Sequence, residues 1–313
     1  MKRRKRNMQE YNYNGKLIIG VDHGYGNMKT AHRVFKTGID ELAGAPIVSE
    51  NYLVYEGKYY VIGESHLTYQ GDKTETEDFF LLTLAAIGEE LAFRGRTQAN
   101  IYLAVGLPLA WAKSQGKAFK EYLLQKQDLV FEYRKQRYEV HICDVAMFPQ
   151  GFAAICQCGR MEGFNMIVDI GNGTMNIMQI HNGKPLEKSL ITEKYGVSCC
   201  IKEIQHELTK NYTDEVPEEM IEPLLRGNKS NSSKRILNGT ETIATRYANE
   251  IMKRLVSYGY KEDLMHLYVI GGGGCLLKNY TDVVDKEGVF FIDDICANAK
   301  GYELLYKVQK KGR

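Results

Sequence analysis

The amino-acid sequence predicts an α/β protein made of two duplicated domains, each with a mixed sheet and covering helices. Its 313 residues are enough for about two domains that each bury a core. Segments with the pattern of strands alternate with segments of helical period, and parallel crossovers are expected in each half. A short motif near the N-terminus also recurs in register about half a chain later, which indicates duplication.

The first half of the chain is expected to form one sheet with three helices. Strands are indicated where β-branched and aromatic residues lie between turn signals: 16–22, 28–35, a hairpin over 52–62 that turns at Glu56 and Gly57, 101–107, and alternating strands over 129–145. Helices are indicated by apolar residues at helical spacing: 79–94, which has an amphipathic pattern and is followed by Gly95, then 113–124, and 151–158 opened by Pro149.

The second half begins again with an apolar strand from Met166 that runs into glycines. Further strands are expected at 267–270 and 289–292, and helices at 199–211, 240–258 and 298–308. Residues 228–233 are polar and are expected to form a loop. The strand at 267–270 stops at four consecutive glycines, after which another helix is expected to start.

The composition excludes several classes of protein. Charged residues make up 26% and hydrophobic residues 44% of the chain, so disorder and fibrous repeats are ruled out. A formal net charge of +2 is too balanced for a protein that works by coating nucleic acid. No stretch approaches the ~18 apolar residues that a membrane span requires, and no apolar region follows the basic residues 2–6 as it does in a signal peptide. We interpret this basic run as a solvated arm.

The cysteines indicate a cytoplasmic protein with reduced thiols. There are seven, an odd number, and they are scattered along the chain rather than spaced as a disulfide framework. Cys156 and Cys158 lack a second pair or a nearby histidine that would complete a zinc site. A structural metal is therefore not expected.

The recurring motif is the most informative feature of the sequence. GVDHGYGNMK at 20–29 and IVDIGNGTMN at 167–176 share the pattern Asp-x-Gly-x-Gly-x-Met, and Asp169 follows Asp22 by 147 positions. Glycines let backbone N–H groups approach an anion closely. An aspartate beside a phosphate requires a cation between them, which indicates Mg²⁺ held through water. The two copies, here called the first loop (24–27) and the second loop (171–174), would bind the phosphates of one nucleotide from both sides.

A third glycine-rich segment, the glycine turn at 271–274, also favours a nucleotide. It lies between a buried strand and an expected helix start. A backbone without side chains can lie flat against a planar ligand, and a helix N-terminus favours negative charge. The spacing matches neither the dinucleotide-binding fingerprint nor a P-loop, because no Gly-Lys-Ser/Thr follows.

These motifs resemble those of the actin/Hsp70/sugar-kinase superfamily, and within it the plasmid-segregation actins of the ParM/StbA type. GVDHGYGNMK and MIVDIGNGTMN resemble the two phosphate loops, and YVIGGGG resembles the adenosine motif. GLPLAW, DVAMFPQGFAA and ANAKGYELLY resemble, in chain order, the TLPL stretch, the connecting segment and the C-terminal helix that returns to the first domain. The resemblance spans nearly the whole chain.

The resemblance implies an actin-like fold, with mixed sheets around a cleft that binds ATP, or GTP, together with Mg²⁺. The first domain would comprise 1–160 with the returning helix 298–313, and the second would comprise 161–297. Asp22 and Asp169 would hold Mg²⁺ through water, and Gln150 would orient the attacking water. The residues expected at the phosphates are Gly24, Tyr25, Gly26, Asn27, Lys29, Gly171, Asn172, Gly173 and Thr174. Those expected at the adenosine are Lys202, Glu203, Gly271, Gly272 and Gly273.

Three positions depart from the family pattern. Tyr25 stands where a small hydroxyl residue is usual, Asn176 where many relatives have an aspartate, and Gln150 where ParM proteins have a glutamate. An amide is not a base near neutral pH, so Gln150 could only align water, and slow hydrolysis is expected. His23, inside the first motif, is expected to face solvent rather than to touch phosphate.

The leading interpretation is a cytoplasmic bacterial ATPase that assembles with itself into filaments. It would partition plasmid DNA through a ParR-type DNA-binding adaptor, without direct contact with DNA or membrane, and slow hydrolysis would time the filament. The alternatives are a small-molecule kinase of the same superfamily, a chaperone-type ATPase, and an ATPase activator with an iron–sulfur cluster. A kinase requires an acidic base and sugar-binding residues, and the sequence identifies neither. Assembly that depends on Mg-ATP would distinguish the filament hypothesis from the kinase hypothesis.

Overall fold

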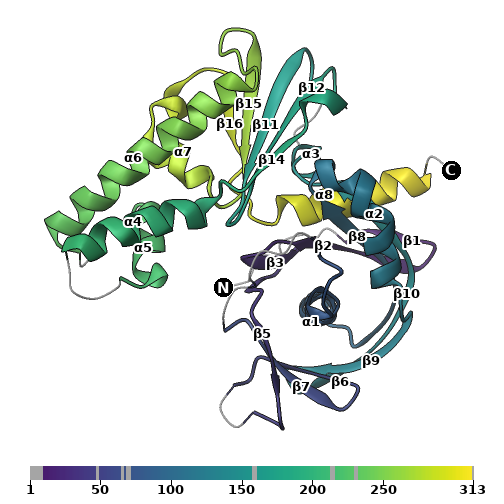
Figure 1. The fold of residues 1–313 in the computed structure, drawn as a ribbon. Helices are drawn as coiled ribbons and strands as arrows, with labels where there is room; N and C mark the ends of the chain where they lie inside the picture. The colour runs from purple at the N-terminus through teal and green to yellow at the C-terminus, as the bar shows by residue number, and fades with distance from the viewer. Residues whose placement is uncertain are drawn as a thin grey trace, which may run out of the picture. The chain divides into compact units, whose positions relative to one another are not determined.

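The computed structural model describes residues 10–46, 49–64, 67, 72–156, 161–211, 216–228 and 232–311. The chain divides into two units (Figure 1): unit 1 is Met1–Gln157 with Cys296–Arg313, and unit 2 is Cys158–Ile295. In these described ranges, no helix combines the length with the apolar character that crossing a bilayer requires.

Unit 1 contains a mixed sheet that has ten strands among the described residues, in the order β4-β3-β2-β8-β10-β9-β6-β7-β5, with β1 paired to β2. The β2–β8 and β8–β10 pairs are parallel, whereas β2–β3, β6–β7 and β9–β10 are antiparallel hairpins. The parallel crossovers expected in this half are confirmed. The strands are β1 Asn12–Tyr13, β2 Lys16–His23, β3 Asn27–Thr30, β4 Val34–Lys36, β5 Ile39–Leu42, β6 Tyr52–Tyr55, β7 Lys58–Ile62, β8 Gln98–Leu107, β9 Asp128–Tyr133 and β10 Gln136–Pro149.

Helix α1 (Asp78–Phe93) lies at the centre of unit 1, and the sheet curves around it (Figure 1). Every residue from Phe79 to Leu91 is buried. The expectation of an amphipathic helix is wrong here, because a helix enclosed by its surroundings must be apolar on all sides. Its glutamates are buried with cationic partners: Arg94 Nε lies 2.7 Å from the carboxylate of Glu90, and an Arg134 nitrogen lies 2.8 Å from that of Glu89.

Two local expectations in unit 1 require correction. Residues 28–35 form two antiparallel strands, β3 and β4, rather than one, because the Thr30 hydroxyl oxygen accepts from the backbone N–H of Arg33 at 3.0 Å and closes a tight turn. Pro149 ends β10 instead of opening a helix, and the helix that follows, α3, covers only Phe152–Ile155. The last two residues of the expected 151–158 helix lie outside the described residues.

The remaining long helices of unit 1 are α2 (Leu109–Leu123) and α8 (Ala297–Lys311). Helix α8 packs so closely on β2 and α3 that two glycines are required. A Cβ on Gly20 would lie 2.0 Å from the carbonyl oxygen of Ala299, and a Cβ on Gly301 would lie 1.9 Å from that of Ala153. Helix α8 is therefore an integral part of unit 1.

Unit 2 carries a mixed sheet with six strands in the described part of the chain, in the order β13-β12-β11-β15-β16, with β14 paired to β12. Alternate residues of the central strands, including Met166, Val168 and Leu267, pack with the helices into one core. The strands are β11 Phe164–Ile170, β12 Met175–His181, β13 Lys184–Pro185, β14 Ile191–Glu193, β15 Met265–Ile270 and β16 Val289–Phe291. The helices are α4 Val197–Asn211, α5 Glu218–Leu225, α6 Lys234–Ser257 and α7 Gly274–Tyr280, with short 3-10 turns at Glu187–Ser189 and Val283–Asp285.

Helix α6 begins before the expected residue 240, because Ser233 caps it by accepting from the backbone N–H of Ile236 at 3.4 Å. Of the expected loop at 228–233, residues 229–231 lie outside the described residues. Helix α5 was not expected, since Pro223 interrupts the helical pattern of its sequence.

The repeat in the sequence has a counterpart in the backbone. Strands β2 and β3 form an antiparallel hairpin and β2 pairs parallel with β8, and strands β11, β12 and β15 repeat this arrangement. The register is also the same, because Asp22 lies opposite Lys29 and Asp169 lies opposite Asn176. Each unit therefore presents its glycine loop at the tip of an equivalent hairpin.

Candidate functional site

The first and second loops are tight turns in which a side chain on the first glycine would crowd the backbone, severely in the first loop and slightly in the second. A Cβ on Gly24 would lie 2.7 Å from the carbonyl oxygen of Asn27, and a Cβ on Gly171 would lie 3.3 Å from that of Thr174, the equivalent residue. The structure places the expected phosphate residues on these two hairpins: Gly24, Tyr25, Gly26, Asn27 and Lys29 on the first, and Gly171, Asn172, Gly173 and Thr174 on the second.

Asp22 is the acidic centre of the unit 1 hairpin. Asp22 is 3% exposed, and its carboxylate accepts from Gln150 Nε2 at 2.8 Å and from Lys29 Nζ at 3.1 Å. Burial alone would raise the pKa of this carboxyl group, but the charges of Lys29 and Lys73 and the two hydrogen bonds hold the pKa of Asp22 below its usual value. Asp22 is therefore charged near neutral pH, and the structure brings it together with Gln150 and Lys29, two residues that the family resemblance assigns to the same site.

Lys73 lies beside the same carboxylate and was missed by the sequence analysis. It is 2% exposed, donates to the backbone carbonyl of His23, and has its ammonium group 5.4 Å from the ring centre of Tyr25 and 5.2 Å from that of Phe79. Burial lowers the pKa of Lys73 to about 8, although Asp22 favours its charged form. No spacing rule marks this lysine, because only the tertiary fold carries it to the first loop.

His23 does not face solvent, so that expectation is wrong. Its side chain is fully buried, with Nε2 2.8 Å from the hydroxyl oxygen of Thr83 and its ring 5.2 Å from that of Phe119. Burial and the charge of Lys73 lower the pKa of His23 to about 3, so the imidazole is neutral. His23 is a core residue, because it is the last residue of β2 and its side chain points inward.

In unit 2, the start of helix α4 orients the second loop. The backbone N–H groups of Val197 and Ser198 donate to the carbonyl oxygens of Gly171 and Asn172 at 3.1 and 2.9 Å. In a trans peptide the C=O and the following N–H point in opposite directions. The N–H groups of Asn172 and Gly173 therefore point away from α4, in an arrangement that can bind an anion.

Asp169 and the glycine turn lie together. Asp169 is 8% exposed, and its Oδ1 lies 2.6 Å from the position that a Cβ on Gly271 would occupy. Gly271 has φ +85°, a conformation that glycine adopts readily. The N–H of Gly273 donates to the carbonyl of Ile170 at 2.9 Å, which fixes the turn to the strand that carries Asp169.

A cavity of about 320 Å³ opens beside the glycine turn. It is lined by Arg226, Val269, Gly271, Gly272, Gly274, Cys275, Lys278, Asn279, Phe291, Ile292, Asp293 and Ile295. Its polar groups are held by partners: Lys278 pairs with Asp293 at 2.9 Å, and Arg226 pairs with Glu222 at 2.7 Å. The flat backbone of the turn, an aromatic wall and fixed polar groups can hold a planar heterocycle. Of these lining residues, only the glycines are marked by a motif in the sequence.

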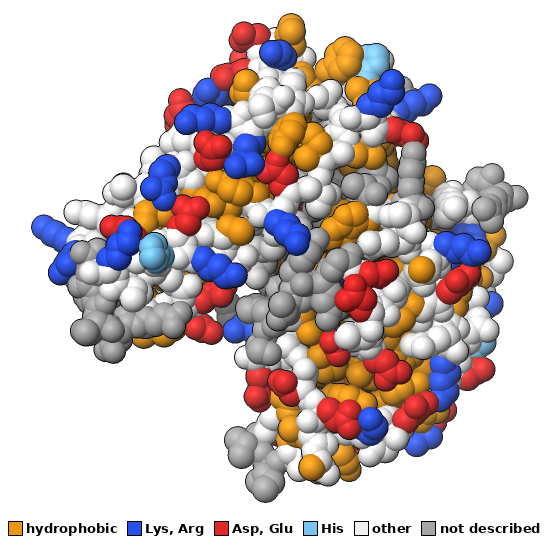
Figure 2. Space-filling view, in the orientation of Figure 1, with side chains coloured by type: hydrophobic (Ala, Val, Ile, Leu, Met, Phe, Trp, Pro, Cys, Tyr) orange, Lys and Arg blue, Asp and Glu red, His pale blue; other side chains and the backbone are white. Residues whose placement is uncertain are grey.

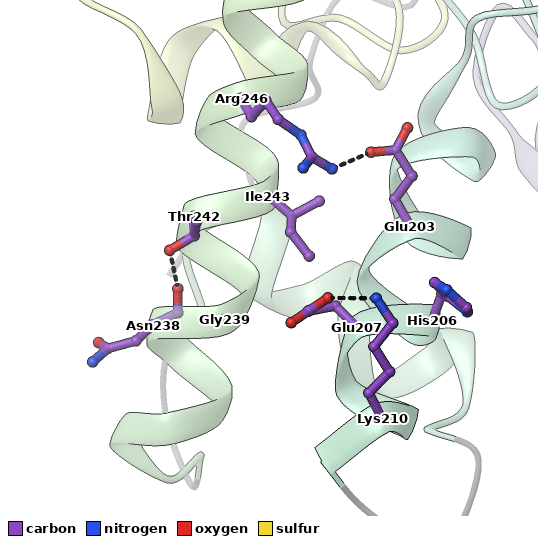
Figure 3. A pocket seen from close by; sticks show the side chains of 9 residues that line it. All are labelled: Glu203, His206, Glu207, Lys210, Asn238, Gly239, Thr242, Ile243 and Arg246. Atoms are coloured by element: carbon purple, nitrogen blue, oxygen red, sulfur yellow. Dashed lines mark hydrogen bonds and ion pairs between the residues drawn. The ribbon is translucent and has the colours of Figure 1, made fainter.

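The structure does not bring Lys202 and Glu203 to this cavity. Both lie on α4, and Glu203 accepts from Arg246 on α6 at 2.7 Å (Figure 3). Glu203 and Arg246 line a different cavity of about 790 Å³ between α4 and α6. The cavity beside the glycine turn therefore does not support the adenosine role expected for Lys202 and Glu203, which stays a prediction.

The donor set fits a cation that is held mainly through water. Among the residues that the structure describes, no three His, Cys, Asp or Glu side chains gather as metal ligands. Mg²⁺ commonly uses one or two carboxylates, several waters and the phosphates of its substrate rather than a full protein cage. Asp22 in unit 1 and Asp169 in unit 2 are each buried at the base of a glycine loop, and each could supply one carboxylate of this kind.

Two family models match consecutive parts of the chain. A model described as "Actin like proteins N terminal domain" matches residues 20–152. A model described as "Archaeal actin homologue MreB-like, C-terminal" matches residues 167–282. No curated protein sequence matches the chain significantly.

Solved structures share the fold over nearly the whole chain. Ta0583, an archaeal actin homologue solved also with ADP, aligns with a TM-score of 0.78 and 21% identity in its native form, covering 93% of this chain and 99% of its own. ParM from Bacillus thuringiensis with AMPPNP aligns with a TM-score of 0.71 and 14% identity, covering 95% of this chain and 100% of its own. The subunit of a 15-stranded ParM filament from Clostridium botulinum aligns with a TM-score of 0.72 and 19% identity, covering 96% and 100%. The expected actin-like fold is confirmed.

Proposed function

Because this chain belongs to the actin-like proteins, we propose that it binds ATP with Mg²⁺, hydrolyses it slowly, and assembles into filaments that partition plasmid DNA in the bacterial cytoplasm. The observation that carries the proposal is the duplicated Asp–Gly hairpin, in which Asp22 and Asp169 occupy the same register position. A ParR-type DNA-binding adaptor would connect the filament to the plasmid.

The phosphate tail would be bound by both loops. In the second loop, the N–H groups of Asn172 and Gly173 point away from α4 and can donate to phosphate oxygens. In the first loop, the ammonium groups of Lys29 and Lys73 supply positive charge beside Asp22. These two kinds of group, backbone N–H donors and cationic side chains, are those that bind phosphate in proteins generally.

Asp22 and Asp169 would hold Mg²⁺ through water. When bound, the ion neutralises charge that develops on the phosphates. Gln150 is already oriented, because its amide nitrogen donates to Asp22 at 2.8 Å. Its carboxamide oxygen can accept a hydrogen bond from the attacking water but cannot remove the proton near neutral pH, so the proton leaves with the phosphate product. Slow turnover follows from the absence of a stronger base at this position.

The base would occupy the cavity beside the glycine turn. Gly271 and Gly272 provide a surface without side chains, and Arg226, Lys278 and Asp293 provide hydrogen-bonding groups at its edge. These groups could recognise the edge of a purine, either adenine or guanine. Lys202 and Glu203, on α4, are not part of this proposal.

Filament assembly and plasmid partition rest on the relatives and on charge. Two of the similar structures are filaments, one described as Alp12 and one as ParM from Clostridium botulinum. The net charge of this chain is only +2, and Figure 2 shows basic and acidic side chains interspersed on the face in view. This charge distribution supports contact with DNA through an adaptor rather than directly.

Sedimentation and phosphate release with Mg-ATP test the proposal. Wild-type protein should pellet only with nucleotide and release phosphate slowly, and electron microscopy should show filaments. Asp169→Ala should lose both activities, whereas Asp263→Ala, which removes an exposed aspartate of the same unit, should keep them. Unchanged hydrolysis by Asp169→Ala would contradict the site assignment, and phosphorylation of a sugar by a monomer would support a kinase.

A second candidate is an actin-like filament that does not act on plasmids. The observation in its favour is the TM-score of 0.78 to the archaeal homologue Ta0583, against 0.69–0.72 for the ParM structures. Loss of a low-copy plasmid on deletion of the gene would support partition, and a defect in cell shape without plasmid loss would support the second candidate.

A further inference from the structure

We propose that Asn298 is a positioning residue for hydrolysis: it fixes the peptide group that follows Gln150 and so holds the Gln150 carboxamide at Asp22. The inference rests on the proposed ATPase function and goes beyond it, because Asn298 belongs to none of the phosphate, metal or base groups above. Asn298 lies at the start of α8 and is 7% exposed.

The peptide group between Gln150 and Gly151 is bonded at both ends. Its carbonyl oxygen accepts from the N–H of Phe152 at 2.9 Å, and its N–H donates to Asn298 Oδ1 at 2.9 Å. Gly151 has φ 77° and ψ −57°, which with the first bond forms a γ-turn of the rare positive-φ kind that glycine, lacking a Cβ, can adopt. Glycine has more backbone freedom than any other residue, so this turn is held by its surroundings, and Asn298 supplies a side-chain bond that does so.

The preceding peptide group is fixed as well. The N–H of Gln150 donates to the carbonyl of Leu107 at 3.0 Å, which continues the β8–β10 ladder. The Cα of Gln150 therefore lies between two fixed peptide groups, one held by the sheet and one by Asn298. This leaves the side-chain torsions as the main freedom of Gln150, and the 2.8 Å bond to Asp22 restricts those.

The same helix also holds the strand that carries Asp22. Glu303 on α8 accepts from the backbone N–H of Gly20 at 3.1 Å and pairs with Arg94 at 2.7 Å, with both side chains buried. Helix α8 therefore contacts β2 two residues before Asp22 and the γ-turn directly after Gln150. We infer that α8 sets the distance between the carboxylate and the amide, with Asn298 as the contact on the amide side.

Asn298→Ala should lower kcat without a matching change in KM for ATP. The substitution leaves the Gly151 N–H without its acceptor and lets the glycine adopt other backbone conformations, while the phosphate and base contacts stay in place. Misplacement of a group that orients a reactant lowers rates by up to about a hundred-fold, so we expect kcat to fall between about ten-fold and a hundred-fold.

Asn298→Asp is the conservative variant. It keeps an oxygen acceptor at the same position, and a negative charge is favoured in the first turn of a helix. It should therefore retain kcat within a few-fold of wild type. Asn165→Ala is the matched control, because Asn165 is a fully buried amide of unit 2 that donates to the carbonyls of Glu162 and Gly163. It should alter stability while kcat stays close to that of wild type.

The experiment measures kcat, KM and thermal stability for wild type and these variants, together with amide hydrogen exchange over residues 148–156. We expect faster exchange of the Gly151 amide and lower kcat in Asn298→Ala, and neither change in Asn298→Asp.

Gly151→Ala changes the donor residue of the same hydrogen bond and places a Cβ on a residue with φ 77°, which strains the turn. It should reproduce the loss of kcat, and it replaces Asn298→Ala if that variant does not fold. Wild-type kcat in folded Asn298→Ala, or equal losses in N298A and N298D, would overturn the inference. Absence of hydrolysis by wild type would instead refute the proposed function.

Discussion

The two loops share one backbone plan but differ in what surrounds their aspartates. Unit 1 places cationic side chains around Asp22, with Lys29 Nζ at 3.1 Å and the buried Lys73 nearby. Unit 2 places backbone around Asp169, with the Cβ position of Gly271 only 2.6 Å from its Oδ1. The duplicated hairpin thus keeps its glycines and its carboxylate, and the two copies have diverged in the charges that they add.

The position opposite each aspartate shows this divergence most directly. Lys29 lies opposite Asp22, and Asn176, which accepts from the Thr192 hydroxyl at 2.9 Å, lies opposite Asp169. A lysine adds charge that responds to pH and to substitution, whereas an amide adds none. We therefore expect nucleotide binding, as proposed, to be sensitive to backbone geometry at the unit 2 loop and to charge at the unit 1 loop.

The largest effect is expected from Gly271→Ala, which tests the backbone side of the comparison. Its Cβ would lie 2.5 Å from the carbonyl oxygen of Ile170 and 2.6 Å from Asp169 Oδ1, at a φ of +85°. We expect a loss of about 2–4 kcal/mol in the free energy of unfolding and no measurable nucleotide binding by calorimetry. Gly116→Ala in α2, where a Cβ would meet nothing within 4 Å, is the control and should retain both the stability and the nucleotide binding of wild type.

Lys73→Met tests whether the cationic side chains around Asp22 contribute to nucleotide binding. Removal of this cation should weaken ATP binding about ten- to a hundred-fold, by analogy with other buried charge contacts. The same substitution should raise the free energy of unfolding, by up to roughly 3 kcal/mol, because burial lowers the pKa of Lys73 from 10.5 to about 8 and that shift opposes folding. Lys58→Met, at an exposed lysine paired with Glu41, should change neither quantity appreciably. A joint loss of affinity and stability in Lys73→Met would show that Lys73 is structural only.

The pH dependence should show the same opposition between affinity and stability. Lys73 loses its proton at about pH 8 in the folded state but only near 10.5 in the unfolded state. Between these values the unfolded state binds more protons, so the contribution of this group makes the free energy of unfolding rise with pH. ATP affinity should fall over the same range, because the cation is lost. The difference between wild type and Lys73→Met, measured against pH, isolates the contribution of Lys73 to the free energy of unfolding and to ATP affinity. If both quantities vary with pH in the same way in the two proteins, Lys73 is not the group that titrates.

The smallest effect is expected from Glu203→Ala, which separates the two cavities of unit 2. Its partner Arg246 is well exposed, so loss of the pair should change the free energy of unfolding by less than about 1 kcal/mol. Nucleotide affinity should not change. Asp293→Ala, beside the glycine turn, should weaken binding several-fold by releasing Lys278. A stronger effect of Glu203→Ala than of Asp293→Ala would place the base between α4 and α6.

The local parts of this molecule could be predicted from sequence. The hairpins of Asp22 and Asp169 follow from short-range patterns of apolar residues and glycine, and the turn at Glu56 and Gly57 is confirmed with φ values of 49° and 80°. The contact of Gln150 with Asp22 joins residues 128 positions apart, and only the family resemblance indicated it.

The remaining features depend on packing that no local pattern encodes. Glu89 and Glu90 gave α1 the pattern of an amphipathic helix, but the fold supplies each with an arginine partner, the buried Arg94 for Glu90 and the exposed Arg134 for Glu89. Lys73 and Arg226 occur in polar or charged segments typical of solvent-exposed surface, and only the tertiary structure carries them to the loop and to the cavity. His23 was expected at the surface because it adjoins glycines, yet its place at the end of a buried strand turns it inward.

The close contact of Gly20 with Ala299 has a consequence for how the chain is made. Unit 1 is discontinuous: its last helix leaves the ribosome only after every residue of unit 2 has been synthesised. Until α8 arrives, the face of β2 at Gly20 that packs against Ala299 is uncovered, and the Arg94 guanidinium lacks the Glu303 carboxylate. Unit 2 can therefore acquire its structure during translation, whereas the half that carries Asp22 and Gln150 is completed last.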